Sequence, residues 1–437
     1  MTGYVDVLGV GFGPGNIALA VALDEMDVHL AARYVERRSV PAWQPGMLLD
    51  GSDIQHNAAR DLALPRNPRS RYTFFNYLFE NDRLFEYLNL GLPYPFRKDY
   101  ARYVTWVAEQ FADRVDFGLE VAALRLTGSE GAGVEAELSD GRTVRARAAV
   151  VAPGRRPRIP EPFAGSTDDR IFHSSAYLQR RAVLDALPEP VIVVVGASQS
   201  AVELVLDLAR SFPRARVVNV LREFGHRQKD LSPFTNEVYF PAFTDYYYDA
   251  SEAAKADLDR QLRHTNYSAS DPDVLQALYA QMYEDRLDDR ERVRLLRHTR
   301  VTQVRAEPDG LRLQLTERHR GDATWLRADV VVLATGYHDL TDESGPELLP
   351  EVLAGIADLV GRTPSGRALV GRDYRLRPRP GAVLPPIYLN GLCETTHGLG
   401  DAGSFSLLSI RSATIATSLA KELSAAAGWP EQHEEAR

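Results

Sequence analysis

The run Tyr4-Val5-Asp6-Val7-Leu8-Gly9-Val10-Gly11-Phe12-Gly13-Pro14 decides the fold. An apolar strand enters a glycine turn, and an Ala/Leu-rich helix at 16–23 follows. Gly9 permits a tight turn, and Gly11 lets the backbone approach a pyrophosphate, whose charge the helix N-terminus favours. Pro14 stands where the usual pattern has a third glycine, next to Gly13. These four residues therefore predict a cradle for a dinucleotide.

An acidic residue and a second cradle extend this prediction. Glu36 follows the second strand (28–35), about 20 residues beyond the turn, where an acid accepts ribose hydroxyls. A second turn, with cofactor-binding candidates at Gly196, Ser198, Gln199 and Ser200, follows the apolar strand at 191–195. Arg222 comes directly after the next strand (217–221), where a cation favours the 2′-phosphate of NADPH over NADH. Two cradles are typical of a flavoprotein that a nicotinamide reduces.

Composition excludes several other classes of protein. The 437 residues are 44% hydrophobic and 25% charged, which is ordinary for a globular protein of two domains. The net charge of −9 predicts no binding to nucleic acid, and no apolar run approaches the roughly 20 residues of a membrane span. Cys393 is the only cysteine, so disulfide reductases and cysteine zinc sites are excluded. We expect no metal and a cytoplasmic protein.

Several short motifs occur in one order along residues 5–420. They are Trp43-Gln44-Pro45-Gly46-Met47, Asn67-Pro68-Arg69-Ser70, Ser232-Pro233-Phe234-Thr235-Asn236-Glu237, Thr265-Asn266-Tyr267, Ala334-Thr335-Gly336-Tyr337 and Thr396-His397-Gly398-Leu399. With the cradles, they resemble the flavin-dependent N-hydroxylating monooxygenases, the lysine/ornithine N-monooxygenase family of siderophore and other specialised-metabolite biosynthesis. Gln44 departs from the histidine that is common in that family.

The resemblance implies an α/β fold with two Rossmann-like dinucleotide-binding domains, in which a discontinuous FAD domain receives an inserted NADPH domain. We expect the first part of the FAD domain at 1–165 and the NADPH domain at 170–333, with substrate loops at 223–270. The second part of the FAD domain, with a closing helix, is expected at 334–425, before a polar tail at 426–437. We also expect a homo-oligomer, a dimer or a tetramer.

Residue roles follow from the resemblance position by position. Gln55 is expected beside the flavin, and Arg60 stands where the family often has a lysine for the substrate carboxylate. Asn236 and Asn266 match asparagines that hold the substrate and the nicotinamide ribose. Ser406, or Ser404 in its place, is expected near the reacting amine. The remaining candidates are His56 and Asn57 for substrate, and Trp43, Thr335, Gly336 and Leu407 for cofactor.

The implied reaction passes a hydride from NADPH to FAD, and O₂ then gives a C4a-hydroperoxide while NADP⁺ is retained. A neutral amine attacks the distal oxygen and becomes a hydroxylamine. An alkyl ammonium has a pKa near roughly 10.4, so the pocket must lower it. Neutral amides such as Gln55, Asn236 and Asn266 suit this task, because they orient the amine without stabilising its charged form.

The identity of the substrate stays open at this point. The family default is the side-chain amine of ornithine or lysine. Arg60, the polar pair His56-Asn57, Arg227 and Lys229 suggest a more cationic pocket, which would suit the α-amine of aspartate and oxidation on to nitroso or nitro. Phe163-x-Gly165 and Phe172-His173-Ser174-Ser175 echo flavin monooxygenases that act on carbon or sulfur. A dinucleotide-binding protein without catalysis is a further alternative.

Overall fold

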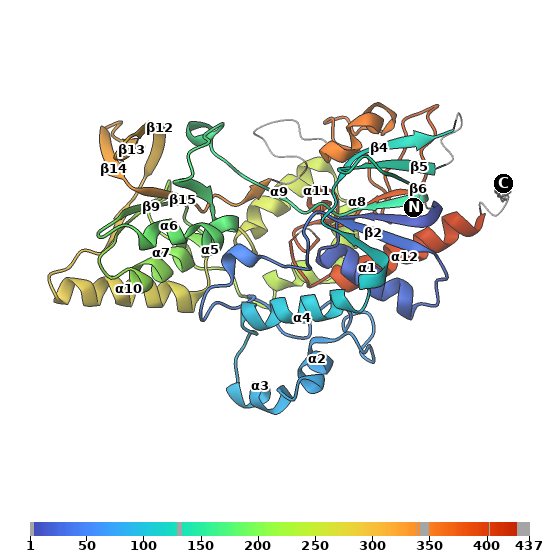
Figure 1. Cartoon of the computed structure of the whole chain (residues 1–437), viewed down its shortest axis with the longest axis horizontal. Helices are drawn as coiled ribbons and strands as arrows, with labels where there is room; N and C mark the ends of the chain where they lie inside the picture. The colour runs from blue at the N-terminus through green and yellow to red at the C-terminus, as the bar shows by residue number, and fades with distance from the viewer. Residues whose placement is uncertain (1–3, 129–132, 339, 341–348, 402, 426–437) are drawn as a thin grey trace.

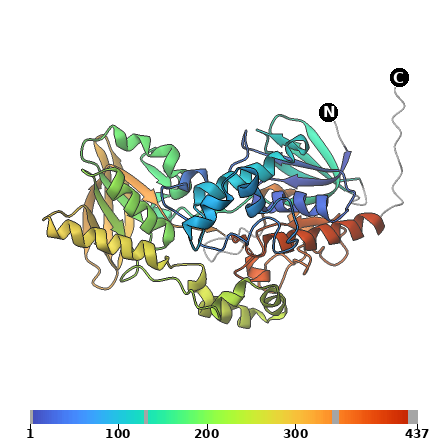
Figure 2. The ribbon, with the colours of Figure 1, turned by 90° about the horizontal axis from the view of Figure 1, so that it is seen from below.

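The computed structural model describes residues 4–128, 133–338, 340, 349–401 and 403–425. Two α/β units lie side by side, each around its own sheet (Figure 1). Figure 2 shows both units from below, with the yellow-green helices α8 (Pro241–Asp249) and α9 (Glu252–Leu262) extending from the second unit toward the first. The polar tail predicted at 426–437 lies outside the described residues.

The first unit is built on a seven-stranded sheet with the order β3-β2-β1-β6-β5-β4, and β17 pairs with β6. Its strands are β1 (Tyr4–Val10), β2 (Ala32–Glu36), β3 (Val115–Phe117), β4 (Val121–Thr127), β5 (Gly133–Leu138), β6 (Thr143–Val151) and β17 (Ile387–Leu389). Helix α1 (Pro14–Glu25) packs against α12 (Leu408–Ala425). Because β17 and α12 come from the C-terminal segment, this unit is discontinuous, as expected from the resemblance.

The second unit has a parallel five-stranded sheet with the order β11-β10-β9-β15-β8. Its strands are β8 (Ile171–His173), β9 (Val191–Val195), β10 (Arg216–Val220), β11 (Val293–Leu296) and β15 (Val330–Leu333). An antiparallel sheet of β12 (Thr299–Glu307), β13 (Gly310–Glu317) and β14 (Ala323–Ala328) adjoins it. The short strands β7 (Arg156–Pro157) and β16 (Tyr337–His338) pair where the chain passes between the units. Both units thus have the α/β architecture that the sequence predicts.

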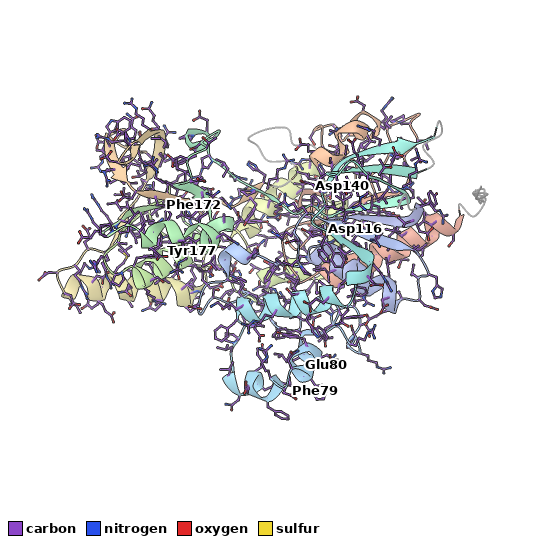
Figure 3. All side chains as sticks on the ribbon, viewed as in Figure 1. Phe79, Glu80, Asp116, Asp140, Phe172 and Tyr177 are labelled. Atoms are coloured by element: carbon purple, nitrogen blue, oxygen red, sulfur yellow. The ribbon has the colours of Figure 1, made fainter. Side chains whose placement is uncertain are left out.

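Helices cover the sheets, and others form the long connections between β2 and β3 and between β10 and β11. The remaining ones are α2 (Phe74–Glu80), α3 (Leu84–Leu90), α4 (Arg97–Glu109), α5 (Tyr177–Arg180), α6 (Ala182–Asp185), α7 (Gln199–Ser211), α10 (Pro272–Leu287) and α11 (Glu394–His397). Helices α2 and α3 project from the first unit, with Phe79 on α2 (Figures 1 and 3). In the described part of the chain, no helix combines the length and apolar character that crossing a bilayer requires.

One detail of the predicted organisation is wrong. The second strand begins at Ala32 rather than residue 28, because its pairing with β1 starts at the register Val7↔Ala32. The segment 157–163, which joins the two units, ends in a short 3-10 helix whose Phe163 is 2% exposed and belongs to the core between the five-stranded sheet and β12–β13. Phe163 therefore fixes the end of this segment in the second unit. The predicted domain boundaries themselves stay predictions.

Candidate functional site

The glycines of the first cradle have different roles from those that the sequence suggests. A Cβ on Gly9 would stand 2.1 Å from the ring of Tyr34, so Gly9 is required by packing and not by the turn. Gly11 makes the turn, with a φ of 82°, and its Cβ would lie 2.5 Å from the carbonyl oxygen of Ala152. A Cβ on Gly13 would meet no described atom within 4 Å. The open space at this turn is therefore at Gly13.

The surroundings of this turn fit a dinucleotide such as FAD. Gly13 is the N-cap of α1 and supplies no side-chain cap, so the first N–H groups of the helix are available to a pyrophosphate. Pro14 begins the helix, where its missing N–H costs no hydrogen bond. Glu36 Oε2 accepts a hydrogen bond from the Phe12 N–H at 2.8 Å, which holds the carboxylate at the end of β2. Asn16 Nδ2 donates to the carbonyl oxygen of Gly11 at 2.8 Å and thereby braces the turn.

The second cradle has the same form at the start of α7. Gly196 has a φ of 148°, and its Cβ would lie 2.2 Å from the carbonyl oxygen of Ala334. Ser198 is the N-cap of α7, and its side chain makes no capping hydrogen bond. The helix start at Ser198 and Ser200 therefore fits a phosphate. Gln199 differs, because its backbone N–H donates to the Ala269 carbonyl oxygen at 3.1 Å and its side-chain amide is also engaged within the protein.

Three other predicted cofactor-binding residues, Arg222, Thr335 and Gly336, belong to the same end of the five-stranded sheet. Arg222 is exposed and stands two positions beyond the end of β10 at Val220, and no ion pair of Arg222 is recorded among the described residues. Its guanidinium is thus free to meet a 2′-phosphate. Gly336 has a φ of 76° and makes the turn after β15, while Thr335 Oγ1 donates to the Arg158 carbonyl oxygen. His173 lies 3.0 Å from the Gly336 carbonyl oxygen, so the Phe172–Ser175 motif supports this turn.

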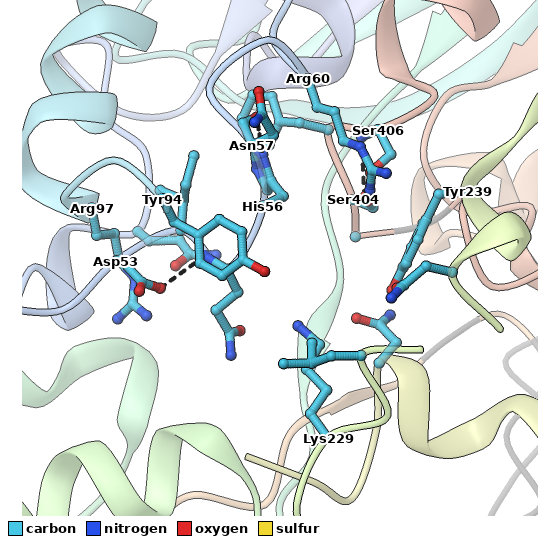
Figure 4. Close-up of a pocket in the computed structure, with 18 of the residues that line it drawn as sticks. Asp53, His56, Asn57, Arg60, Tyr94, Arg97, Lys229, Tyr239, Ser404 and Ser406 are labelled. Atoms are coloured by element: carbon cyan, nitrogen blue, oxygen red, sulfur yellow. Dashed lines mark hydrogen bonds between the residues drawn. The ribbon is translucent and has the colours of Figure 1, made fainter. Parts of the chain in front are cut away.

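A cavity of about 420 Å³ lies where the two units meet (Figure 4). It is lined by residues of four segments, 43–60, 94–97, 229–266 and 403–406. The predicted site residues among them are Trp43, Gln55, His56, Asn57, Arg60, Asn236, Asn266 and Ser406. Leu407 does not line this cavity, since it is buried beside Gly400. The structure therefore brings together residues as far apart in the chain as Trp43 and Ser406.

Gln55 is held in an unusual backbone conformation at this cavity. Its φ of 61° lies in the left-handed region, which residues other than glycine rarely adopt. Asp53 Oδ1 accepts the Gln55 N–H at 2.9 Å and so closes a short turn around it. The Gln55 side chain then reaches the other unit, where Nε2 donates to Asp271 Oδ2 at 2.7 Å. Burial raises the pKa of Asp53 to about 6.

Arg60 supplies the cavity with positive charge. Its Nη1 donates to Ser406 Oγ at 3.2 Å, and Ser406 Oγ in turn accepts from Ser404 Oγ at 2.8 Å. The guanidinium carbon lies 5.4 Å from the ring centroid of Tyr239. No acidic partner of Arg60 is recorded in the described part of the chain, so its fork is available to a carboxylate. Both serines line the cavity, and Ser406 is the one that contacts Arg60.

His56 and Asn57 make the cavity polar without making it charged. The His56 ring packs edge-on against Tyr100, with the centroids 5.4 Å apart, and lies 5.6 Å from the ring of Phe405. His56 Nδ1 is 3.1 Å from the Asn57 carbonyl oxygen. Burial lowers the pKa of His56 to about 4, so the ring is neutral near pH 7.

The more cationic pocket that the sequence suggests is only partly present. Arg227 is exposed, lies 3.1 Å from His264 Nε2 and does not line the cavity. Lys229 does line it, but its Nζ has a carboxylate partner, Asp271 Oδ1, at 3.6 Å. With His56 neutral as well, Arg60 is the cation that carries no carboxylate partner among the described lining residues.

The two asparagines contribute amide groups from the inserted segment. Asn236 Nδ2 donates to the Ser232 carbonyl oxygen at 3.0 Å, which fixes the side chain on its own turn and leaves Oδ1 for other partners. Asn266 also lines the cavity, and within the described residues no hydrogen bond of its side chain is recorded. Their roles in substrate binding stay predictions.

A buried ion pair across the two units has no signal in the sequence. Arg97, from α4, donates to both carboxylate oxygens of Glu203, from α7, at 2.9 and 2.8 Å. The two side chains are 8% and 5% exposed. Arg97 also donates to the Met47 carbonyl oxygen at 2.9 Å. The Arg97–Glu203 pair cannot be predicted from the sequence, because its two members stand far apart along the chain. The same holds for Asp53 and Asp271, whose contacts depend on a local turn or on a distant segment.

Comparison with known proteins places the chain among amino-acid N-monooxygenases. Residues 3–339 match the family model of L-lysine 6-monooxygenase/L-ornithine 5-monooxygenase. An L-ornithine N(5)-monooxygenase of Burkholderia cepacia is 39% identical over 412 residues, which cover 90% of this chain and 89% of that protein. The family resemblance predicted from the motifs is thus confirmed.

Solved structures agree in fold over nearly the whole length. The ornithine hydroxylase of Pseudomonas aeruginosa is 33% identical, with a TM-score of 0.88, covering 96% of this chain and 100% of that one. The ornithine N-hydroxylase of Kutzneria sp. 744, solved with reduced FAD, NADP⁺ and L-ornithine, is 34% identical, with a TM-score of 0.89, covering 96% and 99%. The predicted two-domain Rossmann-like fold is confirmed.

Proposed function

The chain belongs to the L-lysine 6-monooxygenase/L-ornithine 5-monooxygenase family, and from that premise we propose that it N-hydroxylates the side-chain primary amine of an ornithine-type amino acid. It is an NADPH-dependent flavin N-monooxygenase that uses FAD and O₂. A role in making siderophores or other specialised metabolites is part of this proposal. So is the pairing of FAD with the first cradle and NADPH with the second.

The observation that carries the proposal is Arg60 in the cavity between the two units. Its guanidinium has a serine and an aromatic ring as neighbours and faces the cavity that the predicted site residues share. A planar fork of this kind binds a carboxylate through two parallel hydrogen bonds. An amino acid anchored there by its α-carboxylate would extend its side chain into the rest of the cavity.

When bound and reduced, the flavin supplies the activated oxygen atom, and the protein must present a neutral amine to it. The burial of the site disfavours an ammonium and so lowers the pKa of a bound amine. The amide groups of Gln55, Asn236 and Asn266 can accept a hydrogen bond from the amine without stabilising its charged form. The cavity residues thus position the amine and favour its neutral form, while the site excludes bulk water.

Aspartate is the second candidate substrate, and Lys229 is the observation that favours it. Lys229 lines the same cavity as Arg60, and its distance of 3.6 Å from Asp271 is longer than a hydrogen bond. It could therefore turn to a second carboxylate. The ornithine-type amine remains the first candidate, because Lys229 already has Asp271 as a partner and His56 is neutral.

The test is a panel of amines offered to the FAD-loaded protein: ornithine, lysine, putrescine and aspartate. NADPH oxidation, hydroxylamine and hydrogen peroxide are measured together for each amine. The proposal predicts that ornithine or lysine gives about one hydroxylamine per NADPH, and that putrescine, which lacks a carboxylate, gives much less. Coupled product from aspartate alone would replace the first candidate by the second. NADPH oxidation that yields only peroxide with every amine would contradict both.

A further inference from the structure

A continuous set of polar contacts joins the cavity to the start of the second cradle. On the side of the first unit, Gln55 Nε2 donates to Asp271 Oδ2 at 2.7 Å. On the side of the second unit, the Asp271 N–H donates to Gln199 Oε1 at 2.8 Å. Asp271 is thus bonded through its carboxylate to the cavity and through its backbone to the first residue of α7. We call Gln55, Asp271 and Gln199 the junction triad.

The surroundings of the triad make Asp271 its central member. The residue is 3% exposed, and it is the N-cap of α10, which packs beside α7. A buried carboxylate is costly unless it is paired and hydrogen-bonded. Oδ2 has the Gln55 amide, whereas Oδ1 has no hydrogen bond in the described structure and relies on Lys229 Nζ, 3.6 Å away. A movement of Gln55 would therefore leave Asp271 poorly paired.

The far end of the triad is tied to the dinucleotide cradle. Gln199 is the first residue of α7, whose N-terminus fits the phosphates. Its backbone N–H donates to the Ala269 carbonyl oxygen at 3.1 Å, and its Nε2 donates to Glu203 Oε1 at 2.9 Å. Because every polar group of this side chain has a partner, a shift of the helix start is transmitted to the Asp271 backbone.

We propose that Asp271 is a positioning residue that couples dinucleotide binding at the second cradle to the orientation of Gln55 in the cavity. This inference rests on the proposed function, in that the first unit holds FAD and the second holds NADPH. Its consequence is thermodynamic: each cofactor strengthens the binding of the other, by the same factor in both directions. The coupling needs no amine substrate, since Gln55, which is expected beside the flavin, and Gln199, at the start of α7, are both hydrogen-bonded to Asp271.

The experiment measures the dissociation constant of FAD for the full-length protein, with and without saturating NADP⁺. We expect NADP⁺ to tighten FAD binding about tenfold in the wild type, within the usual range of such couplings. In Asp271→Ala this ratio should fall to about one, while the dissociation constant of FAD without NADP⁺ stays within about threefold of the wild type. An NADP⁺ titration of the FAD-loaded variant confirms that the second cradle still binds.

Two further variants separate coupling from a general loss of structure. Asp273→Asn removes a charge from an exposed position at the start of the same helix, and should keep the wild-type ratio. Gln55→Leu should abolish the coupling as Asp271→Ala does, and the double variant should show no further loss. Thermal melting of each variant confirms folding.

An unchanged ratio in Asp271→Ala, or additive losses in the double variant, would overturn the inference. A ratio of one in the wild type would overturn it as well. These outcomes are distinct from failure of the proposed function, which the amine panel reports separately. A wild type that binds both cofactors with coupling but hydroxylates no amine would refute the proposed function alone.

Discussion

Replacement of Arg60 by methionine removes the proposed carboxylate anchor while keeping a side chain of similar length. A hydrogen bond to a charged group contributes about 1.5–3 kcal/mol, and the guanidinium fork offers two. Since Arg60 is half-buried, screening by water reduces this sum, and we take about 3 kcal/mol in total. With about 1.36 kcal/mol for each factor of ten, the KM for the amino acid should rise roughly 150-fold.

The assay is steady-state hydroxylamine formation, with the substrate varied at saturating NADPH. Flavin reduction by NADPH, measured without oxygen in a rapid-mixing instrument, should be unchanged, because Arg60 is assigned to the substrate and not to the hydride donor. Arg60→Lys keeps the charge but loses the fork, and should raise the KM about tenfold. For putrescine, which has no carboxylate, Arg60→Met should change the KM little.

A KM for the amino acid that stays within about threefold of the wild type in Arg60→Met would refute the assignment of Arg60 to the substrate carboxylate. The binding free energy lost with the guanidinium would then be under about 0.7 kcal/mol. An equal rise for the amino acid and for putrescine would also refute it, because the lost contact would then not be to a carboxylate.

Four other substitutions test the cradles and the cavity. Arg222→Ala should raise the KM for NADPH roughly 10- to 100-fold and leave the KM for NADH unchanged; equal effects on both would contradict a 2′-phosphate contact. Gly11→Ala should lower the melting temperature of the protein without FAD, whereas Gly13→Ala should melt normally and bind FAD more weakly, and calorimetry with a FAD titration checks both. Because burial lowers the pKa of His56 to about 4, folding favours the neutral ring, and the free energy of unfolding should fall as pH drops from about 6.5 to about 4. In His56→Gln the fall in the free energy of unfolding should be smaller by the contribution of this ring. If urea unfolding gives the same pH dependence for the wild type and the variant across that range, the ring does not titrate as described.

Periodicity and glycine turns predicted the elements that depend on short-range sequence. The strand β9 matches the apolar run at 191–195 residue for residue, because a parallel strand buried on both faces needs an unbroken apolar stretch. The glycine turn itself is also predicted from sequence, but the sequence assigns the turn to Gly9, whereas the φ of 82° that favours glycine is at Gly11. The reason for Gly9 is not predictable from sequence, because it is the ring of Tyr34 on a neighbouring strand.

The cavity shows what the sequence could not give. Arg60, Asn236 and Asn266 were identified by resemblance, and they do line one cavity. The charge balance of the cavity depends on residues that the fold brings in from elsewhere in the chain. Asp271, for example, reaches Lys229 and Gln55 from a distant segment. The burial that lowers the pKa of His56 is likewise a property of the assembled fold. For this reason the residues were predictable, whereas the electrostatic balance of the cavity was not.

The proposed reaction transfers one oxygen atom of O₂ to the side-chain nitrogen of an amino acid whose carboxylate is bound by Arg60. The most direct measurement is mass spectrometry of the product formed from ornithine or lysine under isotopically labelled O₂, with NADPH consumption followed in the same sample. The account predicts one labelled oxygen atom on the side-chain nitrogen for each NADPH consumed, and loss of this product in Arg60→Met. Label that appears only in hydrogen peroxide, or on carbon or sulfur of an added acceptor, would contradict it.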